Sequence, residues 1–182
     1  MKINKIAIVS KFGSKESEKV AVELAKKLLK LKSQVFTVAP VSVDGVKKVR
    51  SIEDLKKIKL DLAITLGGDG TTLRTFRNIA NETPLLAVNV GGNRGILSEI
   101  TLSEIDKALQ HIKKNEIWID KRTRVTASCN GETFQPALNE IYVNRKNLTK
   151  TAEFKIKFQN DTIMQRMDGV IISTPSGSTG HS

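Results

Sequence analysis

One turn in this sequence combines a carboxylate with three glycines directly after a short apolar run, Gly67-Gly68-Asp69-Gly70. Glycines let backbone N–H groups approach a phosphate closely, and the N-terminus of a following helix favours anions. Because a carboxylate repels phosphate, Asp69 suggests another task, either accepting the proton of an attacking hydroxyl or holding a cation that bridges phosphates. The alternative is a tight turn in which Asp69 only caps the helix. Spacing alone leaves both open, since the turn is neither a Walker loop nor a G-x-G-x-x-G fingerprint.

Two further polar groups lie in the last third of the chain. The pair Asn139-Glu140 places an amide beside a carboxylate, which suits the hydroxyls of a ribose; the alternative is a strand end with solvated polar groups. Arg166-x-Asp168-Gly169 leads through an apolar run to residues 173–180 (STPSGSTG). Hydroxyls and backbone amides in such a loop suit phosphates and sugars, whereas the alternative is a flexible surface loop.

Basic side chains lie close in sequence to these groups. A guanidinium neutralises phosphate well, although an arginine taken singly is more often a surface residue. The candidates are Arg74, one helical turn after Asp69, and then Arg94, Arg122, Arg124 and Arg145.

The first two-thirds of the chain alternate short apolar runs with helical patterns. This alternation predicts a parallel sheet covered by helices. In such sheets ligands bind beyond the carboxyl ends of the strands, which is where the Asp69 turn and the glycines that follow the fourth strand both fall. Strands are expected at Lys5–Ser10, 34–39, 61–66 and 84–90. Helices are expected at 14–32, after a capping box of Ser51 with Asp54, from a cap at Thr71 or Thr72 through residue 80, and from Thr101.

The pattern changes near residue 115. Strand-like runs at 117–129 and 132–144 flank Asn130-Gly131, a strong signal for a two-residue hairpin. Alternation at 153–158 and an apolar run at 168–174 predict more strands. The expected fold class is α/β + β: a Rossmann-like parallel α/β domain over 1–115, followed by an antiparallel β-rich domain over 116–182. We expect the β-rich domain to be incomplete, since the chain stops directly after a glycine-rich stretch.

Composition limits the classes of partner. The net charge of +11 suits nucleic acid, a membrane surface or a phosphate-rich small molecule, or simply a lysine-rich solvated surface. Aromatic residues make up only 4%, so stacking on nucleobases, and with it nucleic acid, is not expected. No apolar run approaches the roughly 20 residues that span a bilayer, and no signal peptide precedes the first strand. The single cysteine, Cys129, fits a reducing cytoplasm, and no metal-ligand set is expected.

Taken together, these elements resemble the NAD kinase family in order, spacing and content. The match consists of the GGDG turn after a hydrophobic strand, the glycine-rich stretch 89–95, the pair Asn139-Glu140, and the run DGVIISTPSGSTG from Asp168. The GGDG turn also occurs in diacylglycerol-type lipid kinases and, in variant form, in phosphofructokinases. The run from Asp168 is far more specific, and the resemblance extends from Ile6 to the last residue.

This resemblance implies transfer of a phosphoryl group from ATP, or from polyphosphate, to the 2′-hydroxyl of the adenosine ribose of NAD, which gives NADP. It implies Asp69 as the general base, Mg²⁺ or another divalent cation brought with the nucleotide, and a homodimer or homotetramer. By similarity, NAD is bound by Gly70, Arg74, Asn139, Glu140, Arg166, Asp168, Ser176, Thr179 and Gly180. The phosphates of the donor are bound by Gly67, Gly68, Thr71, Asn93 and Arg94.

The chain departs from the family pattern at two places. Gly180-His181 stands where Ala-Tyr is common, and Ile96-Leu97 follows Gly95 where phenylalanine is usual. Two other functions stay open. One is a lipid kinase of the diacylglycerol type, which shares the GGDG turn and the two-domain plan. The other is a binding module without catalysis, either a dinucleotide-binding fragment or a basic binder of nucleic acid.

Overall fold

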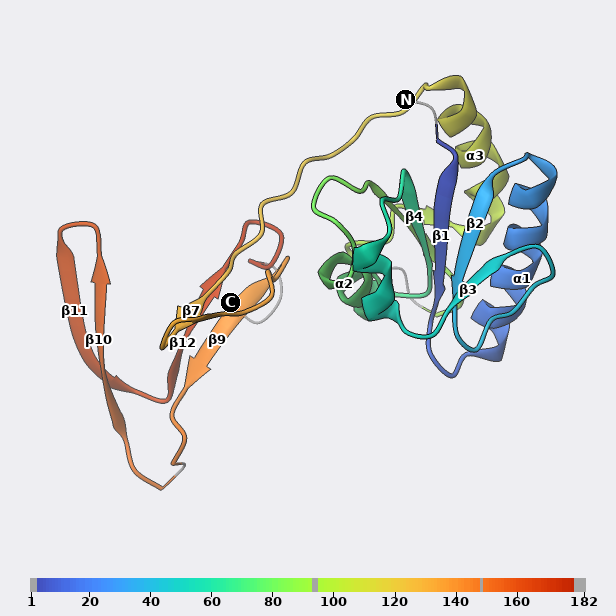
Figure 1. Cartoon of the computed structure of the whole chain (residues 1–182). Coiled ribbons are helices and arrows are strands. Elements are labelled where there is room, and N and C mark those ends of the chain that lie inside the picture. Colours follow the sequence, from blue (N-terminus) through green and yellow to red (C-terminus); the bar gives the residue numbers. More distant parts are fainter. Residues whose placement is uncertain (1–2, 93–94, 148, 179–182) are drawn as a thin grey trace. The chain divides into compact units, whose positions relative to one another are not determined.

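A computed structural model describes residues 3–92, 95–147 and 149–178. Four predicted site residues, Asn93, Arg94, Thr179 and Gly180, therefore lie outside the described residues. The chain separates into two compact units, Met1–Asp120 and Lys121–Ser182 (Figure 1). The sequence pattern placed this boundary near residue 115.

The first unit is built on a six-stranded parallel sheet with the order β3-β2-β1-β4-β5-β6. The chain runs from β1 outward through β2 to β3 on one side of β1, and then crosses to β4 on the other side. The winding of the sheet therefore reverses between β1 and β4, the place where ligands bind in open α/β sheets. The strands are β1 (Lys5–Ser10), β2 (Gln34–Val38), β3 (Lys47–Val49), β4 (Leu62–Leu66), β5 (Leu85–Asn89) and β6 (Ile100–Thr101).

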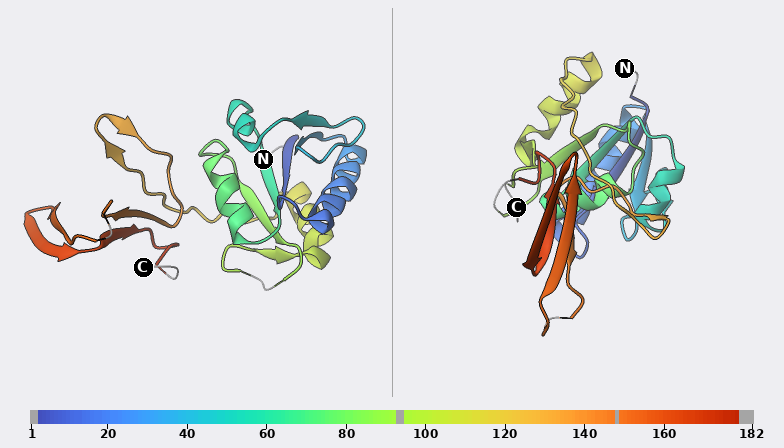
Figure 2. Two further views of the ribbon diagram at one scale, coloured as in Figure 1. Left: turned by 90° about the horizontal axis from the view of Figure 1, so that it is seen from below. Right: turned by 90° about the vertical axis from the view of Figure 1, so that its left-hand side faces the viewer.

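Helices cover both faces of this sheet (Figure 2). Successive side chains of a strand point to opposite faces, so each strand contributes to a hydrophobic core on both faces of the sheet. In β1, Ile6 and Ile8 lie on one face, and Ala7 and Val9 lie on the other. Every residue of β4 is buried, as expected for a parallel strand covered on both sides. The first face packs against α1 (Lys15–Lys30) and α3 (Ile105–Lys114), and α3 follows the short 3₁₀ helix η2 (Leu102–Glu104). The second face packs against α2 (Asp69–Arg77) and the 3₁₀ helix η1 (Ile52–Lys57).

The predicted start of α2 was wrong. The helix begins at Asp69 with Gly68 as its N-cap, so neither Thr71 nor Thr72 caps it. The Thr72 hydroxyl instead lies buried 3.2 Å from the hydroxyl of Thr65 on β4. The Thr72 side chain therefore contacts β4 instead of capping the helix. The two edge strands β3 and β6 were also missed, because runs of three and two residues carry almost no periodicity.

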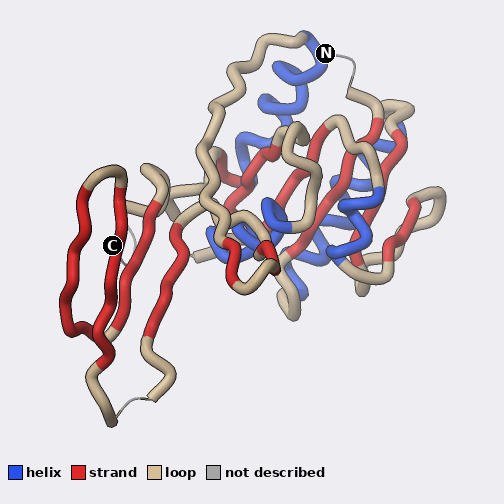
Figure 3. Tube along the Cα trace, turned by 60° about the vertical axis from the view of Figure 1, so that its left-hand side comes forward, coloured by secondary structure: helices blue, strands red, loops and turns tan. Residues whose placement is uncertain are grey.

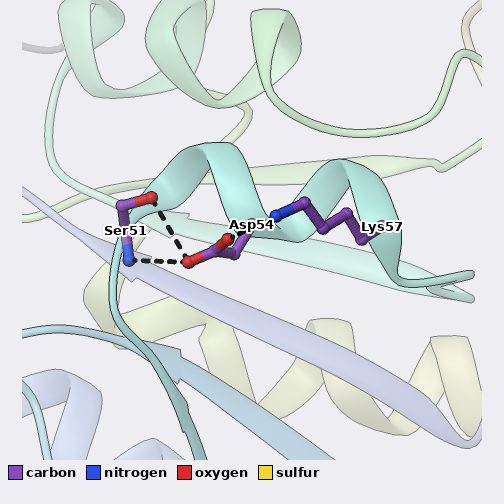
Figure 4. A network of polar contacts seen from close by, with 3 residues as sticks. All are labelled: Ser51, Asp54 and Lys57. Carbon is purple, nitrogen blue, oxygen red and sulfur yellow. Dashed lines mark hydrogen bonds and ion pairs between the residues drawn. The ribbon is translucent and has the colours of Figure 1, made fainter.

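The predicted capping box at Ser51 is confirmed (Figure 4). The Asp54 carboxylate accepts hydrogen bonds from the backbone N–H of Ser51 at 3.3 Å and from the Lys57 ammonium at 3.1 Å. The contact with Lys57, and after it the Ser51 N–H, lowers the pKa of Asp54. The helix that begins here buries Ile52 and Leu55 against the second face of the sheet.

Asp61 ties the amino end of β4 to that of β1. Its carboxylate accepts the backbone N–H groups of Lys5 at 2.8 Å and of Asn4 at 2.9 Å. These two hydrogen bonds, that from Lys5 first, hold the pKa of Asp61 below its usual range. A depressed folded-state pKa means that this stabilisation is complete above the unfolded-state pKa and is lost as the pH falls through the folded-state pKa.

Asp61→Asn is therefore expected to lower the free energy of unfolding near neutral pH by about 1 kcal/mol, the usual net value of such a hydrogen bond. The difference from the wild type should shrink as the pH falls, because the wild-type carboxyl then becomes increasingly protonated. Urea unfolding at neutral pH and near pH 3 measures both. Asp44→Asn, the same change at an exposed loop position, should leave stability unchanged. A loss from Asp61→Asn that is equal at both pH values would contradict the assignment.

The second unit is antiparallel, as predicted. Its described residues contain the hairpin of β7 (Ser128–Cys129) with β8 (Glu132–Thr133), the hairpin of β10 (Ala152–Phe158) with β11 (Asp161–Met167), and the pair β9 (Glu140–Asn144) with β12 (Gly169–Ser173). In the part of the chain that the structure describes, all helices belong to the first unit (Figure 3).

The hairpin at Asn130-Gly131 is confirmed, with φ of 51° and 82° at the two turn residues. Positive φ at both positions is what a type I′ turn requires. The flanking strands are much shorter than predicted. Beyond them the pairing continues through the Phe134 N–H, which donates to the Ala127 carbonyl at 2.9 Å, and through the bridge between Val125 and Ala137. Pro136, which has no N–H to donate, interrupts the second run.

Candidate functional site

The turn between β4 and α2 places Asp69 at the carboxyl end of the sheet. The turn is bonded to its neighbours on both sides, because Gly67 N–H donates to Val88 of β5 at 3.0 Å and Lys11 N–H, after β1, donates to Leu66 at 2.8 Å. A Cβ at Gly67 would lie 2.7 Å from Thr71 Oγ1 and 3.0 Å from Lys11 Cβ. Glycine is therefore required at this position for lack of space.

The Asp69 carboxylate is held by the loop after β5 and not by its own helix. Its Oδ2 accepts the Ile96 N–H at 3.0 Å, and its Oδ1 accepts the Leu97 N–H at 3.1 Å. Asp69 is itself the first residue of α2, after the N-cap Gly68, and capping of that helix does not explain bonds to N–H groups 27 and 28 residues away. Each carboxylate oxygen has two acceptor positions, and the bonds from the described residues leave one on each for another donor, such as a substrate hydroxyl.

Of the residues predicted to bind the donor phosphates, Gly67 and Gly68 lie on this turn and Thr71 lies in the first turn of α2. Gly68 and Gly70 have open space where a side chain would stand, with no heavy atom within 4 Å of a Cβ placed at either. Arg74 and Gly70 are exposed, and Thr71 is half-buried. Exposed backbone beside a half-buried carboxylate, at the N-terminus of a helix, forms a surface that suits phosphates in contact with a hydroxyl.

Lys11 was not among the predicted site residues. It follows the central strand β1, and its Cβ lies beside Gly67. Its position in the sequence could have revealed it. Lys11 directly follows β1, and the winding of the sheet reverses between β1 and β4, so this residue lies next to the turn after β4. Its exposed side chain adds a positive charge at the same edge as Asp69.

In the second unit the loop after β12 packs against the start of β9. Thr174 N–H donates to the Asn139 carbonyl at 2.8 Å, and the Thr174 hydroxyl donates to the Leu138 carbonyl. Ser173 is paired with Glu140 in the antiparallel ladder, and a Cβ at Gly177 would lie 2.3 Å from the Asn139 carbonyl oxygen. The structure thus brings the pair Asn139-Glu140 and the hydroxyl-rich loop together.

Two acceptor atoms of this group lack partners. Asn139 Oδ1 and Glu140 Oε2 are buried and accept no hydrogen bond from the part of the chain that the structure describes. A buried polar atom without a partner costs about 1–3 kcal/mol, so such atoms point to a ligand or water that supplies the donors. The half-buried Ser176 lies in the adjoining loop. Acceptors of this kind fit the hydroxyl groups of a ribose.

The other predicted residues of this unit lie apart from that pair. Arg166 is exposed on β11, opposite Glu153 of the same hairpin. Asp168 precedes β12 and forms an ion pair with Arg145, with Arg145 Nη2 3.0 Å from Asp168 Oδ1. Arg145 therefore neutralises this carboxylate within the second unit.

The described residues contain neither a cluster of metal-ligating side chains nor a helix able to cross a membrane. No group of three or more histidine, cysteine, aspartate or glutamate side chains is arranged to hold a metal ion. None of the helices in the described ranges is long and apolar enough to cross a membrane.

Comparison with known proteins places these features in a family. The model of the ATP-NAD kinase N-terminal domain matches residues 6–117, and that of the ATP-NAD kinase C-terminal domain matches residues 138–182. The NAD kinase of Methanothermobacter thermautotrophicus is 32% identical over 181 residues, which cover 98% of this chain and 63% of that protein. An NAD kinase of Clostridium perfringens is 40% identical over 131 residues, 69% of this chain and 47% of that protein.

Solved structures show the same fold. Yeast NADH kinase in complex with NADH matches with a TM-score of 0.83 and 22% identity, over 98% of this chain and 60% of that chain. An NAD kinase from Archaeoglobus fulgidus in complex with ATP matches with a TM-score of 0.67 and 24% identity, over 97% of this chain and 63% of that chain. The chain thus spans about half to two-thirds of the length of its relatives. Because the two family models together match most of the sequence, the chain belongs to the NAD kinase family.

Proposed function

We propose that this chain carries the catalytic turn and NAD-binding residues of an NAD kinase, which phosphorylates the 2′-hydroxyl of the adenosine ribose of NAD to give NADP. The observation that carries the proposal is the Asp69 carboxylate, held by two backbone N–H groups at the carboxyl end of a parallel sheet. Membership of the NAD kinase family supports the same reaction.

In the proposed reaction the ribose oxygen attacks the terminal phosphorus of ATP or polyphosphate. The bond from that phosphorus to its bridging oxygen breaks, and ADP or a shortened polyphosphate leaves. Such a transfer needs alignment, neutralisation of charge and an acceptor for the hydroxyl proton. Asp69 accepts that proton as general base. The proposed ligands of the donor phosphates are Gly67 and Gly68 on the turn, Thr71 in α2, and in addition Asn93 and Arg94.

The proposed ligands of NAD come from both parts of the sequence. The unpartnered acceptors Asn139 Oδ1 and Glu140 Oε2 support a role for this pair in binding ribose hydroxyls. The backbone of Gly70 and the exposed Arg74 suit the diphosphate of the dinucleotide. The remaining proposed ligands, which rest on the family resemblance, are Arg166, Asp168, Ser176, Thr179 and Gly180.

Mg²⁺, or another divalent cation, is proposed to enter as part of the donor substrate. Mg²⁺ is commonly held by substrate phosphates and water with few protein ligands, and therefore needs no cage of side chains. The net charge of +11 favours two polyanionic substrates. The proposal includes a homodimer or homotetramer as the working form and the cytoplasm as its location, where the single exposed Cys129 fits a reducing environment.

The proposal is tested by following the γ-phosphate of radiolabelled ATP with NAD and with a diacylglycerol as alternative acceptors. Labelled NADP is the expected product. Labelled lipid would replace the proposal with a lipid kinase. If NAD raises the unfolding temperature in a saturable manner without any transfer, the chain is a dinucleotide-binding module. The absence of both binding and transfer would overturn the proposal.

Asn139→Ala is expected to weaken NAD binding roughly fivefold, because the ribose loses a buried acceptor worth about 1 kcal/mol. The affinity for ATP should change little. Isothermal titration calorimetry measures both affinities. Gln135→Ala removes an exposed amide of the same unit and is expected to leave both affinities unchanged. An equal loss for NAD and ATP would contradict the assignment of Asn139 to NAD.

A further inference from the structure

The loop after β5 surrounds the Asp69 carboxylate with backbone. Ile96 and Leu97 each donate one N–H, and each to a different oxygen, so the plane of the carboxylate is defined by two contacts. The loop is itself anchored, because Leu97 is buried and Glu99 N–H donates to the Ala87 carbonyl of β5 at 3.0 Å. The side chain of Ile96 is 66% exposed, so only its backbone serves this contact.

Gly95 opens the space that this arrangement needs. A Cβ at Gly95 would lie 2.2 Å from Asp69 Oδ1, 2.4 Å from Cγ and 2.5 Å from Oδ2. Each of these distances is far inside van der Waals contact. The atoms in the way are the end of a short side chain and not backbone. A methyl group at residue 95 therefore displaces the carboxylate while the loop and the sheet keep their places.

We propose that Gly95 is the positioning residue of Asp69: its missing side chain lets the carboxylate reach the N–H groups of Ile96 and Leu97, which together orient the base. This inference rests on the proposed function of Asp69 as base. Catalysis requires such orientation, because a misplacement of about 1 Å at a reacting group costs on the order of 10²-fold in rate. Gly95 does not touch substrate in this proposal and acts only through Asp69.

The geometry is tested by NMR on the full chain without any substrate. The amide proton signals of Ile96 and Leu97 should lie downfield in the wild type, because both N–H groups donate to the Asp69 carboxylate. Gly95→Ala and Asp69→Ala should each move both signals upfield by a similar amount. Unchanged signals in Gly95→Ala would overturn the positioning role.

A double-mutant cycle separates crowding of Asp69 from a general need for glycine. Gly95→Ala should lower the unfolding temperature of the wild type by roughly 2–4 °C. In Asp69→Ala, where the carboxylate is gone, the same substitution should have almost no effect. An equal loss in both backgrounds would show that residue 95 requires glycine for reasons unrelated to Asp69, and would overturn the proposal.

Kinetics then distinguish failure of this inference from failure of the proposed function. Gly95→Ala is expected to lower kcat for NAD phosphorylation about 10²-fold, with little change in the KM for NAD. If the wild type forms NADP and Gly95→Ala has the same kcat as the wild type, the positioning role is contradicted and the kinase assignment is unaffected. If the wild type forms no NADP, the proposed function fails, and the amide shifts and the double-mutant cycle alone decide whether Gly95 positions Asp69.

Discussion

Asp69→Asn is expected to lower the rate of NAD phosphorylation by roughly 10²–10⁴-fold, the usual contribution of general-base catalysis. An amide does not accept the hydroxyl proton, and the ribose oxygen would have to attack while still protonated. NAD binding should persist, since the proposed ligands of the dinucleotide are unchanged. Steady-state kinetics measures kcat, and calorimetry measures NAD affinity. A kcat close to the wild-type value would contradict the role of base.

The matched control is Asp106→Asn, the same chemical change at an exposed carboxylate that pairs with Lys27. It should leave kcat unchanged. The substitution at Asp69 also has a structural effect, because its two oxygens accept two N–H groups and asparagine offers only one oxygen. Thermal unfolding measures that effect separately, so that a loss of rate is not mistaken for a loss of fold.

Gly177→Ala is expected to destabilise the second unit by about 1–3 kcal/mol, the typical cost of overpacking. The new Cβ would lie 2.3 Å from the Asn139 carbonyl oxygen and 2.5 Å from its carbonyl carbon. Since these atoms are backbone, either the loop or the start of β9 must move. The displaced pair Asn139-Glu140 should then bind NAD about tenfold more weakly, a loss of about 1.4 kcal/mol. Thermal unfolding and calorimetry measure the two effects.

Gly70→Ala provides the control for the stability effect. No heavy atom lies within 4 Å of a Cβ at Gly70, and the residue is inside α2. Alanine is favoured over glycine in a helix by about 1 kcal/mol, so stability should be unchanged or higher. If Gly177→Ala unfolds at the wild-type temperature and binds NAD normally, the contact with Asn139 does not matter to the site.

Much of the first unit was predictable, because its strands and helices are encoded locally. The apolar run of β4 and the helical spacing in α1 each reveal an element without reference to distant residues. The failures share a cause. The short edge strands and the start of α2 depend on neighbours in space, such as Thr65 beneath Thr72, and no window of sequence contains both partners in a recognisable pattern.

The candidate site divides in the same way. The sequence by itself determined which chemical groups are present, namely a carboxylate among glycines, an amide beside a carboxylate, and a loop of hydroxyls. It also carried the resemblance to a family. Only the tertiary structure decided what holds these groups. The partners of Asp69 lie 27 and 28 residues further along the chain and arrive through the pairing of β4 with β5. The loop at Gly177 reaches Asn139 through the pairing of β9 with β12. Strand pairing is a non-local interaction. The local sequence therefore gives the type of a side chain, whereas the pairing of distant strands sets its orientation.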